Sequence, residues 1–320
     1  MSIFEKAFEK TSGQTTEDLL DDSVDELLDM PELPALDEAA HAGPGDVDES
    51  PERPAEPGMR DKQLPGSGAG KMVKLDLDGL KETGLVDPRS KEVNRTTEEF
   101  RRIKRPLLMN VRGEGASEVA NANMIMVTSA LAGEGKTFTS INLAMSIATE
   151  MDRTVLLVDA DVAKPDVTSR LGVEAEKGLI DVLLDDSLML SDVLLRTDIP
   201  KLTLLPSGSR HVHSTELLAS ERMRQLTLEL STRYSDRVVI FDSPPLLLTS
   251  EASVLASLMG QVVMVVEESN TSQHAVKEAV ELLQDNEIVG IVMNKGSRGS
   301  SGEGYSYYGY SPYGLSLIHI

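Results

Sequence analysis

The sequence predicts an α/β fold in which a mostly parallel sheet is flanked by helices on both faces. Short, continuous β-branched runs such as residues 262–266 are typical of strands that are covered on both sides. Amphipathic stretches alternate with these runs, which implies parallel strands joined by crossover helices. We expect strands near residues 124–129, 154–159, 201–206, 237–242, 261–266 and 288–293, and helices near 96–110, 136–150, 178–185, 215–233, 250–258 and 271–285.

The first of these strands leads into a loop of small residues at 130–137 and then into a helix. Gly133 and Gly135 allow the backbone N–H groups to point inward at an anion, and the helix adds its positive dipole end. Lys136 is placed to reach the outer phosphates of a nucleotide, and the Thr137 hydroxyl to hold Mg²⁺. The pattern is that of a P-loop NTPase, with alanine in place of the first glycine. A turn that only caps a helix is the alternative.

Two of the expected strands end in aspartate. Asp159 and Asp161 follow one strand, and Asp242 follows another. The carboxyl ends of parallel strands form the ligand-binding edge of such sheets, so these acids are expected beside the loop. Asp242 fits a metal-assisting role, while one of Asp159 and Asp161 faces the metal and the other orients or deprotonates an incoming hydroxyl. The alternative is that all three are turn residues or helix caps.

Asn294 ends the last expected strand. Its amide is placed to read the edge of an adenine base, and a turn-forming asparagine is the alternative. The sequence therefore predicts the following nucleotide-binding residues: Gly133, Glu134, Gly135, Lys136, Thr137, Phe138 and Asn294.

Composition excludes several classes of function. A net charge of −22 argues against broad nucleic-acid affinity, and the absence of cysteine excludes disulfides and thiolate metal sites. His211 and His213 are the only histidines with metal-ligand spacing, and we interpret them as a solvated loop. No apolar run is long enough to span a membrane, and the opening residues lack the pattern of a secretory signal.

The two ends of the chain differ from its middle. Residues 1–70 carry 18 Asp and Glu against 5 Lys and Arg, with 7 of the 15 prolines, so we expect disorder there. Two apolar stripes within them, at 3–8 and 19–28, fit either partner-docking helices or unbound coil. The expected organisation is a disordered acidic segment at 1–70, a linker at 71–95, a P-loop domain at 96–296 and a flexible tyrosine-rich tail at 297–320.

Five of the six tyrosines lie within nine residues of that tail. Tyrosine rings on a glycine-spaced terminus are not explained by packing in a core, so we interpret them as a cluster of phosphate acceptors. A low-complexity aromatic tail is the alternative. The predicted acceptors are Tyr305, Tyr307, Tyr308, Tyr310 and Tyr313.

The helix expected at 96–110 carries Glu99, Arg102 and Arg105 three residues apart, on one face. From spacing alone this is a solvated charged face, and Pro106 is expected to disturb the turn that follows it.

Taken together, the chain resembles the bacterial protein-tyrosine kinases of exopolysaccharide and capsule systems, most closely the tyrosine autokinases of exosortase-associated loci. The resemblance is carried by ALAGEGKT at 130–137 (Walker A), VLLVDAD at 155–161 (Walker A′) and VVIFDSPP at 238–245 (Walker B). The tyrosine cluster and the opening MSIFEKAFEK add to it.

The resemblance implies an ATP-dependent tyrosine autokinase that phosphorylates its own C-terminal cluster in trans. Lys136 then binds the β- and γ-phosphates and Thr137 coordinates Mg²⁺. Asp159 and Asp161 bind metal and activate the tyrosine hydroxyl, either of them serving as the base, and Asp242 assists the metal.

It also implies partners. Glu99, Arg102 and Arg105 match the family's Glu-x-x-Arg-x-x-Arg helix, which mediates ring-like homo-oligomers. A separate chain-length-determinant membrane protein is expected to recruit this cytoplasmic chain to the inner face of the membrane and activate it. A protein-tyrosine phosphatase is the expected antagonist, and regulation of exopolysaccharide synthesis and export the expected role.

Two departures and two alternatives accompany this resemblance. Ala163 stands where many relatives place an arginine, and residues 315–320 match no expected element, which suggests a foreign terminal sequence. A partition- or division-site-type ATPase shares the fold but carries a second lysine where this chain has Leu131. A nucleotide-dependent export scaffold with feeble kinase activity is the other alternative.

Overall fold

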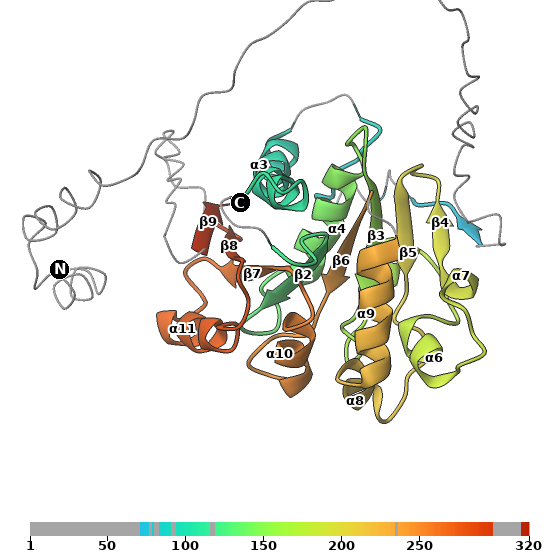
Figure 1. Cartoon of the computed structure of the whole chain (residues 1–320). Coiled ribbons are helices and arrows are strands. Elements are labelled where there is room, and N and C mark those ends of the chain that lie inside the picture. The colour runs from blue at the N-terminus through green and yellow to red at the C-terminus, as the bar shows by residue number, and fades with distance from the viewer. Residues whose placement is uncertain are drawn as a thin grey trace, which may run out of the picture. The chain divides into compact units, whose positions relative to one another are not determined.

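A twisted, mostly parallel β-sheet runs through the centre of the described part of the chain (Figure 1). Its described strands follow the order β1-β4-β5-β3-β6-β2-β7-β8-β9. The antiparallel pair is β4 with β5, and the other described pairs are parallel. The strands are β1 (Met72–Val73), β2 (Met124–Ser129), β3 (Thr154–Asp159), β4 (Leu195–Thr197), β5 (Leu202–Leu205), β6 (Arg237–Asp242), β7 (Gln261–Glu267), β8 (Val289–Asn294) and β9 (Leu315–His319).

This computed structural model describes residues 71–76, 79, 83–90, 94–115, 119–233, 236–296 and 315–319. All of them belong to the compact unit Met59–Ile320, and the other unit, Met1–Gly58, lies outside the described residues. The expectations for residues 1–70 and for the five tail tyrosines therefore also fall outside them. No helix in the described part of the chain combines the length and the hydropathy needed to cross a membrane.

The described helices are α3 (Arg95–Val111), α4 (Lys136–Ile147), α5 (Val167–Arg170), α6 (Leu179–Leu184), α7 (Leu190–Val193), α8 (Ser214–Leu218), α9 (Glu221–Arg233), α10 (Ser250–Ala256) and α11 (Gln273–Glu281). The longest, α3, has Asn94 as its N-cap, whose side chain accepts a hydrogen bond from the Thr97 N–H, and it continues through Pro106 to Val111.

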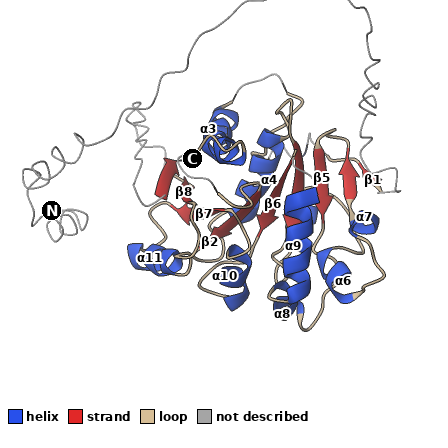
Figure 2. Cartoon of the chain, viewed as in Figure 1, coloured by secondary structure: helices blue, strands red, loops and turns tan. Residues whose placement is uncertain are grey.

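Side chains alternate between the two faces of the sheet, and each face is covered by its own helices. On β2, Ile125 and Val127 pack in the cluster under α3 and α4, whereas Met124 and Met126 pack in the cluster under α6, α8, α9, α10 and α11. Figure 2 shows these two groups of helices on opposite sides of the sheet. The predicted α/β fold with a mostly parallel, helix-flanked sheet is confirmed.

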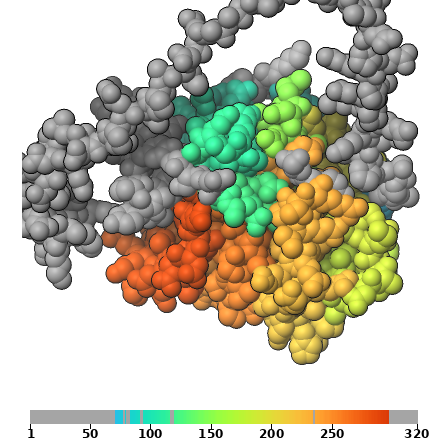
Figure 3. Space-filling view, in the orientation of Figure 1, coloured from blue at the N-terminus to red at the C-terminus, as the bar shows by residue number. Residues whose placement is uncertain are grey.

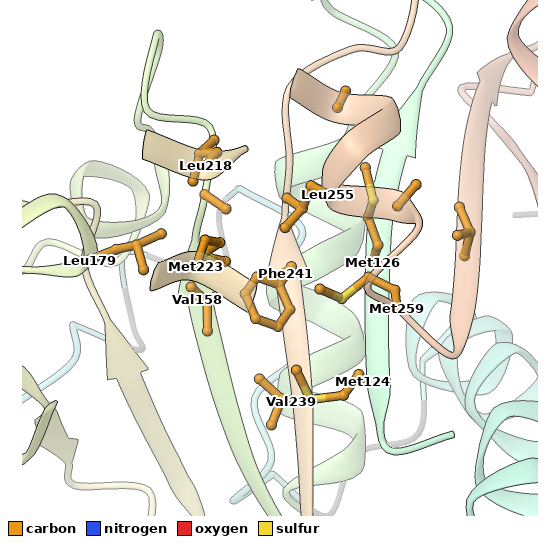
Figure 4. Packing of buried hydrophobic residues seen from close by; sticks show 14 of the residues in the cluster. Met124, Met126, Val158, Leu179, Leu218, Met223, Val239, Phe241, Leu255 and Met259 are labelled. Atoms are coloured by element: carbon orange, nitrogen blue, oxygen red, sulfur yellow. The ribbon is translucent and has the colours of Figure 1, made fainter. Parts of the chain in front are cut away.

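More helices cover the second cluster than the first. Figure 4 shows the Phe241 ring of β6 in it, together with Met126, Met223 and Leu255. The space-filling view in Figure 3 shows the side chains of α8, α9 and α10, in gold to orange, side by side over this layer.

Three segments differ from the sequence prediction. Residues 71–95 were expected to be a linker, but they supply β1, and Leu75, Leu85 and Val86 are buried in the core. The helix expected at 215–233 is two helices, because Ser220 interrupts it and its hydroxyl accepts from the Met223 N–H at 3.2 Å. Residues 315–319 were expected to match no element, but their backbone pairs with β8 as β9.

Candidate nucleotide-binding site

The loop between β2 and α4 has the backbone of an anion-binding turn. Gly133 and Gly135 have φ of 90° and 102°, a region that side chains with a Cβ rarely adopt. Gly135 is also the N-cap of α4, so the helix directs its first N–H groups at the loop. Ala130 is fully buried and is absent from the described non-glycine residues with positive φ, so alanine fits in place of the first glycine.

The Lys136 ammonium group contacts a carboxylate from the next strand. Its Nζ lies 2.5 Å from Oδ2 of Asp161, and both side chains are largely buried. The other oxygen of Asp161 accepts a hydrogen bond from the Lys164 N–H at 3.1 Å. One carboxylate oxygen of Asp161 therefore stabilises the turn that follows β3, and the other contacts Lys136 of the phosphate loop.

Asp159 and Asp242 occupy paired positions at the ends of β3 and β6. Asp159 accepts from the Val167 N–H at 3.1 Å, and Asp242 accepts from the Ser140 hydroxyl at 3.0 Å. The remaining oxygens, Oδ1 of Asp159 and Oδ2 of Asp242, are buried without a hydrogen-bond partner. Since β3 ends at Asp159, Asp161 lies beyond the strand, where it faces Lys136.

Burial controls the ionisation of this pair. It raises the pKa of Asp242 to about 6, although Lys136 and hydrogen bonds from Thr137 and Ser140 oppose the rise. Burial also raises the pKa of Asp159 well above its ordinary value, and the nearby Asp242 carboxylate adds to the rise. A cation at this edge would favour the charged form of both groups.

These atoms fit a magnesium ion bound together with phosphate. Mg²⁺ takes oxygen ligands and uses few from the protein, so the two partnerless buried carboxylate oxygens suit it, as does the Thr137 hydroxyl, which is hydrogen-bonded to Asp242. Among the described residues, no group of three or more His, Cys, Asp or Glu side chains is arranged to hold a metal ion by itself. The donor set therefore fits a metal whose remaining ligands come from a nucleotide and water.

Two residues at the end of β8 donate hydrogen bonds to carbonyl groups of the phosphate loop. Asn294 donates to the Glu134 carbonyl at 2.8 Å, and Lys295 donates to the Gly133 carbonyl at 2.8 Å. The Glu134 carboxylate accepts from the Leu131 N–H at 2.6 Å and from the Thr271 hydroxyl. The prediction that Asn294 contacts adenine stays a prediction. The sequence analysis did not identify Lys295, whose only signal is that it directly follows β8, or Thr271, which lies just before the N-cap of α11.

The other predicted residues lie on or against α3. Phe138 turns away from the loop and packs edge-on against Phe100, with ring centroids 6.2 Å apart. Glu99 forms an ion pair with Arg95 at 2.6 Å, and Arg102 and Arg105 are exposed on the helix. The structure thus brings residues 133–137, the three aspartates and Asn294 together, and Glu99, Arg102 and Arg105 are not part of this group.

The parallel sheet, the loop after β2 and the carboxylates that end β3 and β6 define a P-loop NTPase. A family model described as an AAA domain matches residues 122–289. The tyrosine-protein kinase YwqD of Bacillus subtilis is 35% identical over 198 residues, which cover 61% of this chain and 81% of YwqD. The putative tyrosine-protein kinase EpsB of Ralstonia nicotianae is 32% identical over 201 residues, 62% of this chain but only 26% of EpsB.

Solved structures agree with this assignment. The kinase domain of the Escherichia coli tyrosine kinase ETK superposes with a TM-score of 0.56 at 25% identity, covering 72% of this chain and 97% of that domain. The VpsO kinase domain superposes with a TM-score of 0.51 at 29% identity, covering 64% of this chain and all of that domain. The chain belongs to the AAA-domain family and, within it, to the bacterial tyrosine-protein kinases.

Proposed function

We propose that the chain is an ATP-dependent protein-tyrosine autokinase. In this proposal it transfers the γ-phosphoryl group of ATP to its C-terminal tyrosines, in trans between subunits of a homo-oligomer. The observation that carries the proposal is the contact of Lys136 with Asp161 beside the partnerless oxygens of Asp159 and Asp242. It supports the proposal because a lysine suited to bind phosphate and carboxylates suited to serve as metal ligands and base lie at one edge of the sheet.

The residues divide the work of phosphoryl transfer. The loop N–H groups and Lys136 hold and neutralise the β- and γ-phosphates, while Thr137 and the carboxylates of Asp159 and Asp242 supply ligands for Mg²⁺. When bound, the metal ion neutralises charge that develops on the phosphate oxygens. Asp159 or Asp161 accepts the proton of the tyrosine hydroxyl as its oxygen bonds to the γ-phosphorus. The bond from that phosphorus to the bridging oxygen breaks, and ADP leaves.

The proposal extends to the setting of the reaction. Copies of the chain associate in a ring through Glu99, Arg102 and Arg105, and a separate chain-length-determinant membrane protein recruits and activates them at the inner face of the membrane. A protein-tyrosine phosphatase reverses the modification, and the cycle regulates exopolysaccharide synthesis and export. The names of the tyrosine-protein kinases that the chain resembles support the kinase activity.

The test is incubation of the full chain and its activator with labelled ATP and Mg²⁺, followed by mapping of phosphotyrosine. We expect label on the tail and none after Lys136→Met. ATP hydrolysis without phosphotyrosine would instead support a partition- or division-site-type ATPase. ATP binding with only traces of label on tyrosine would support a nucleotide-dependent scaffold.

A second experiment addresses assembly. Each phosphate adds about −1.5 to −2 charges to an already acidic chain, so we propose that phosphorylation loosens the ring. A variant with all five tail tyrosines changed to Phe should stay assembled in the presence of ATP. If that variant still cycled between assembly states, this part of the proposal would be wrong.

A further inference from the structure

Two neighbouring residues at the end of β8 hold consecutive carbonyl groups of the phosphate loop. Asn294 Nδ2 donates to the carbonyl of Glu134, and Lys295 Nζ donates to the carbonyl of Gly133, each at 2.8 Å. These partners are 160 and 162 residues apart in the chain. The order β2-β7-β8 brings them together across β7.

The direction of a carbonyl group fixes the direction of the next N–H group. In a planar trans peptide the C=O of one residue and the N–H of the next point in opposite directions. A donor to the Gly133 carbonyl therefore directs the Glu134 N–H to the opposite side of the loop, and a donor to the Glu134 carbonyl does the same for the Gly135 N–H. That opposite side is the concave side of the loop, where phosphate oxygens are bound in such turns.

We propose that Asn294 and Lys295 are positioning residues that orient the Glu134 and Gly135 N–H groups toward the phosphates of the nucleotide. The inference rests on the proposed nucleotide site and assigns Asn294 a task other than reading the base. Both polar atoms of its side chain are already engaged, since Oδ1 accepts from the Lys295 N–H at 2.8 Å.

The contact is built closely enough to be specific. A Cβ at Gly135 would lie 2.0 Å from Asn294 Nδ2, so the asparagine fits only against glycine there. Lys295 has a φ of 60°, unusual for a residue with a side chain, and its Nζ also lies 3.0 Å from Oε2 of Glu267. That second contact holds the ammonium group behind the loop.

The Glu134 side chain supports the same arrangement. A buried carboxylate inside an anion-binding loop would repel phosphate if it pointed to the concave side of the loop. It points away instead, toward the Leu131 N–H and the Thr271 hydroxyl. The loop is therefore held from behind at its carbonyl groups and at this carboxylate.

The test compares the affinities of the full chain for ATP, GTP and inorganic tripolyphosphate by calorimetry. Asn294→Leu removes the donor without adding charge, and Lys295→Met removes the other donor. Lys277→Met, on the surface of α11, is the control for loss of one positive charge. We expect each loop-contact variant to bind ATP and tripolyphosphate about fivefold to tenfold more weakly, with the ratio of ATP to GTP affinity unchanged.

Kinetic measurements separate positioning from a general loss of structure. We expect the KM for ATP to rise about fivefold while kcat at saturating ATP stays within about twofold, and Lys295→Arg to recover most of the loss. Unchanged tripolyphosphate affinity in both Asn294→Leu and Lys295→Met would overturn the inference, as would a collapse of the ATP-to-GTP ratio in Asn294→Leu. If Asn294→Leu does not fold, Lys295→Met and Lys295→Arg decide the question. Failure of the wild-type chain to bind ATP would count against the proposed function itself.

Discussion

Asp159 and Asp242 end adjacent strands in register, and each keeps one buried carboxylate oxygen without a hydrogen-bond partner. Two neighbouring acids in such a position destabilise the ligand-free fold, because burial and mutual repulsion both disfavour their charged forms. A cation offsets both effects, so the stability of this edge of the sheet depends on what binds there.

Replacing Asp242 with Asn should stabilise the ligand-free protein at neutral pH. The folded protein raises the pKa of this acid from 3.8 to about 6, so its cost begins as pH rises above 3.8, grows until pH passes about 6, and is complete above about pH 7. Thermal or urea unfolding should show an advantage of Asp242→Asn that widens by roughly 1 kcal/mol between pH 5 and pH 7. Asp161→Asn is the matched control, and it should destabilise because it leaves Lys136 unpaired. An advantage that does not change with pH would contradict the prediction.

Asp181 joins the start of α6 to the loop after β5. Its Oδ2 accepts from the Gly178 N–H at 2.8 Å and from the Ser209 N–H at 3.0 Å. Burial alone would raise its pKa, but the hydrogen bonds from Ser209 and Gly178 outweigh burial and lower it. Asp181→Ala should cost about 1 to 2 kcal/mol in urea unfolding. The loss of stability should be full at neutral pH and should shrink as pH falls below about 4. The control variant Asp285→Ala should change the free energy of unfolding little.

Lys104 links α3 to the end of α4. Its buried ammonium group lies 2.7 Å from the Glu150 carboxylate, 2.7 Å from the Ser146 carbonyl and 3.1 Å from the Thr149 hydroxyl. Lys104→Ala should destabilise the fold by about 3 kcal/mol, since it removes a partly buried ion pair together with the stem that packs around it. Lys104→Met keeps the stem and should cost less. Equal losses in calorimetry would show that packing contributes nothing.

The charges on the outer face of α3 should control association. Arg102→Glu and Arg105→Glu each replace a positive charge with a negative one in the proposed interface, which also contains Glu99. Each variant should therefore raise the dissociation constant of the homo-oligomer at least about tenfold. Sedimentation velocity measures this change, with Lys277→Glu on α11 as the control. Assemblies of unchanged size in both arginine variants would rule out this interface.

Strands that carry the site were predictable because their local signals were strong. β2, β3 and β6 are continuous apolar runs that end in a motif or an acid, and their predicted bounds agree with the observed ones. β4 has three residues and β1 has two, which is too few to show a period within the strand. Pairing in the finished sheet, rather than propensity, makes them strands.

The contacts of the site were less predictable than its residues. Motifs identified Lys136, Asp159 and Asp242 from neighbours in sequence, but Lys295 reaches the loop only because β8 lies two strands from β2. Likewise, nothing local indicates that Glu134 turns its carboxylate toward Thr271. Such contacts follow from the order of strands, which a single sequence does not reveal.

The strand that leads into the phosphate loop is hydrogen-bonded along both edges, to β6 and β7, and is buried on both faces. Its amide protons should consequently be among the slowest in the domain to exchange with deuterium, with or without nucleotide. The phosphate loop is therefore attached to a strand that should stay folded whether or not nucleotide is bound.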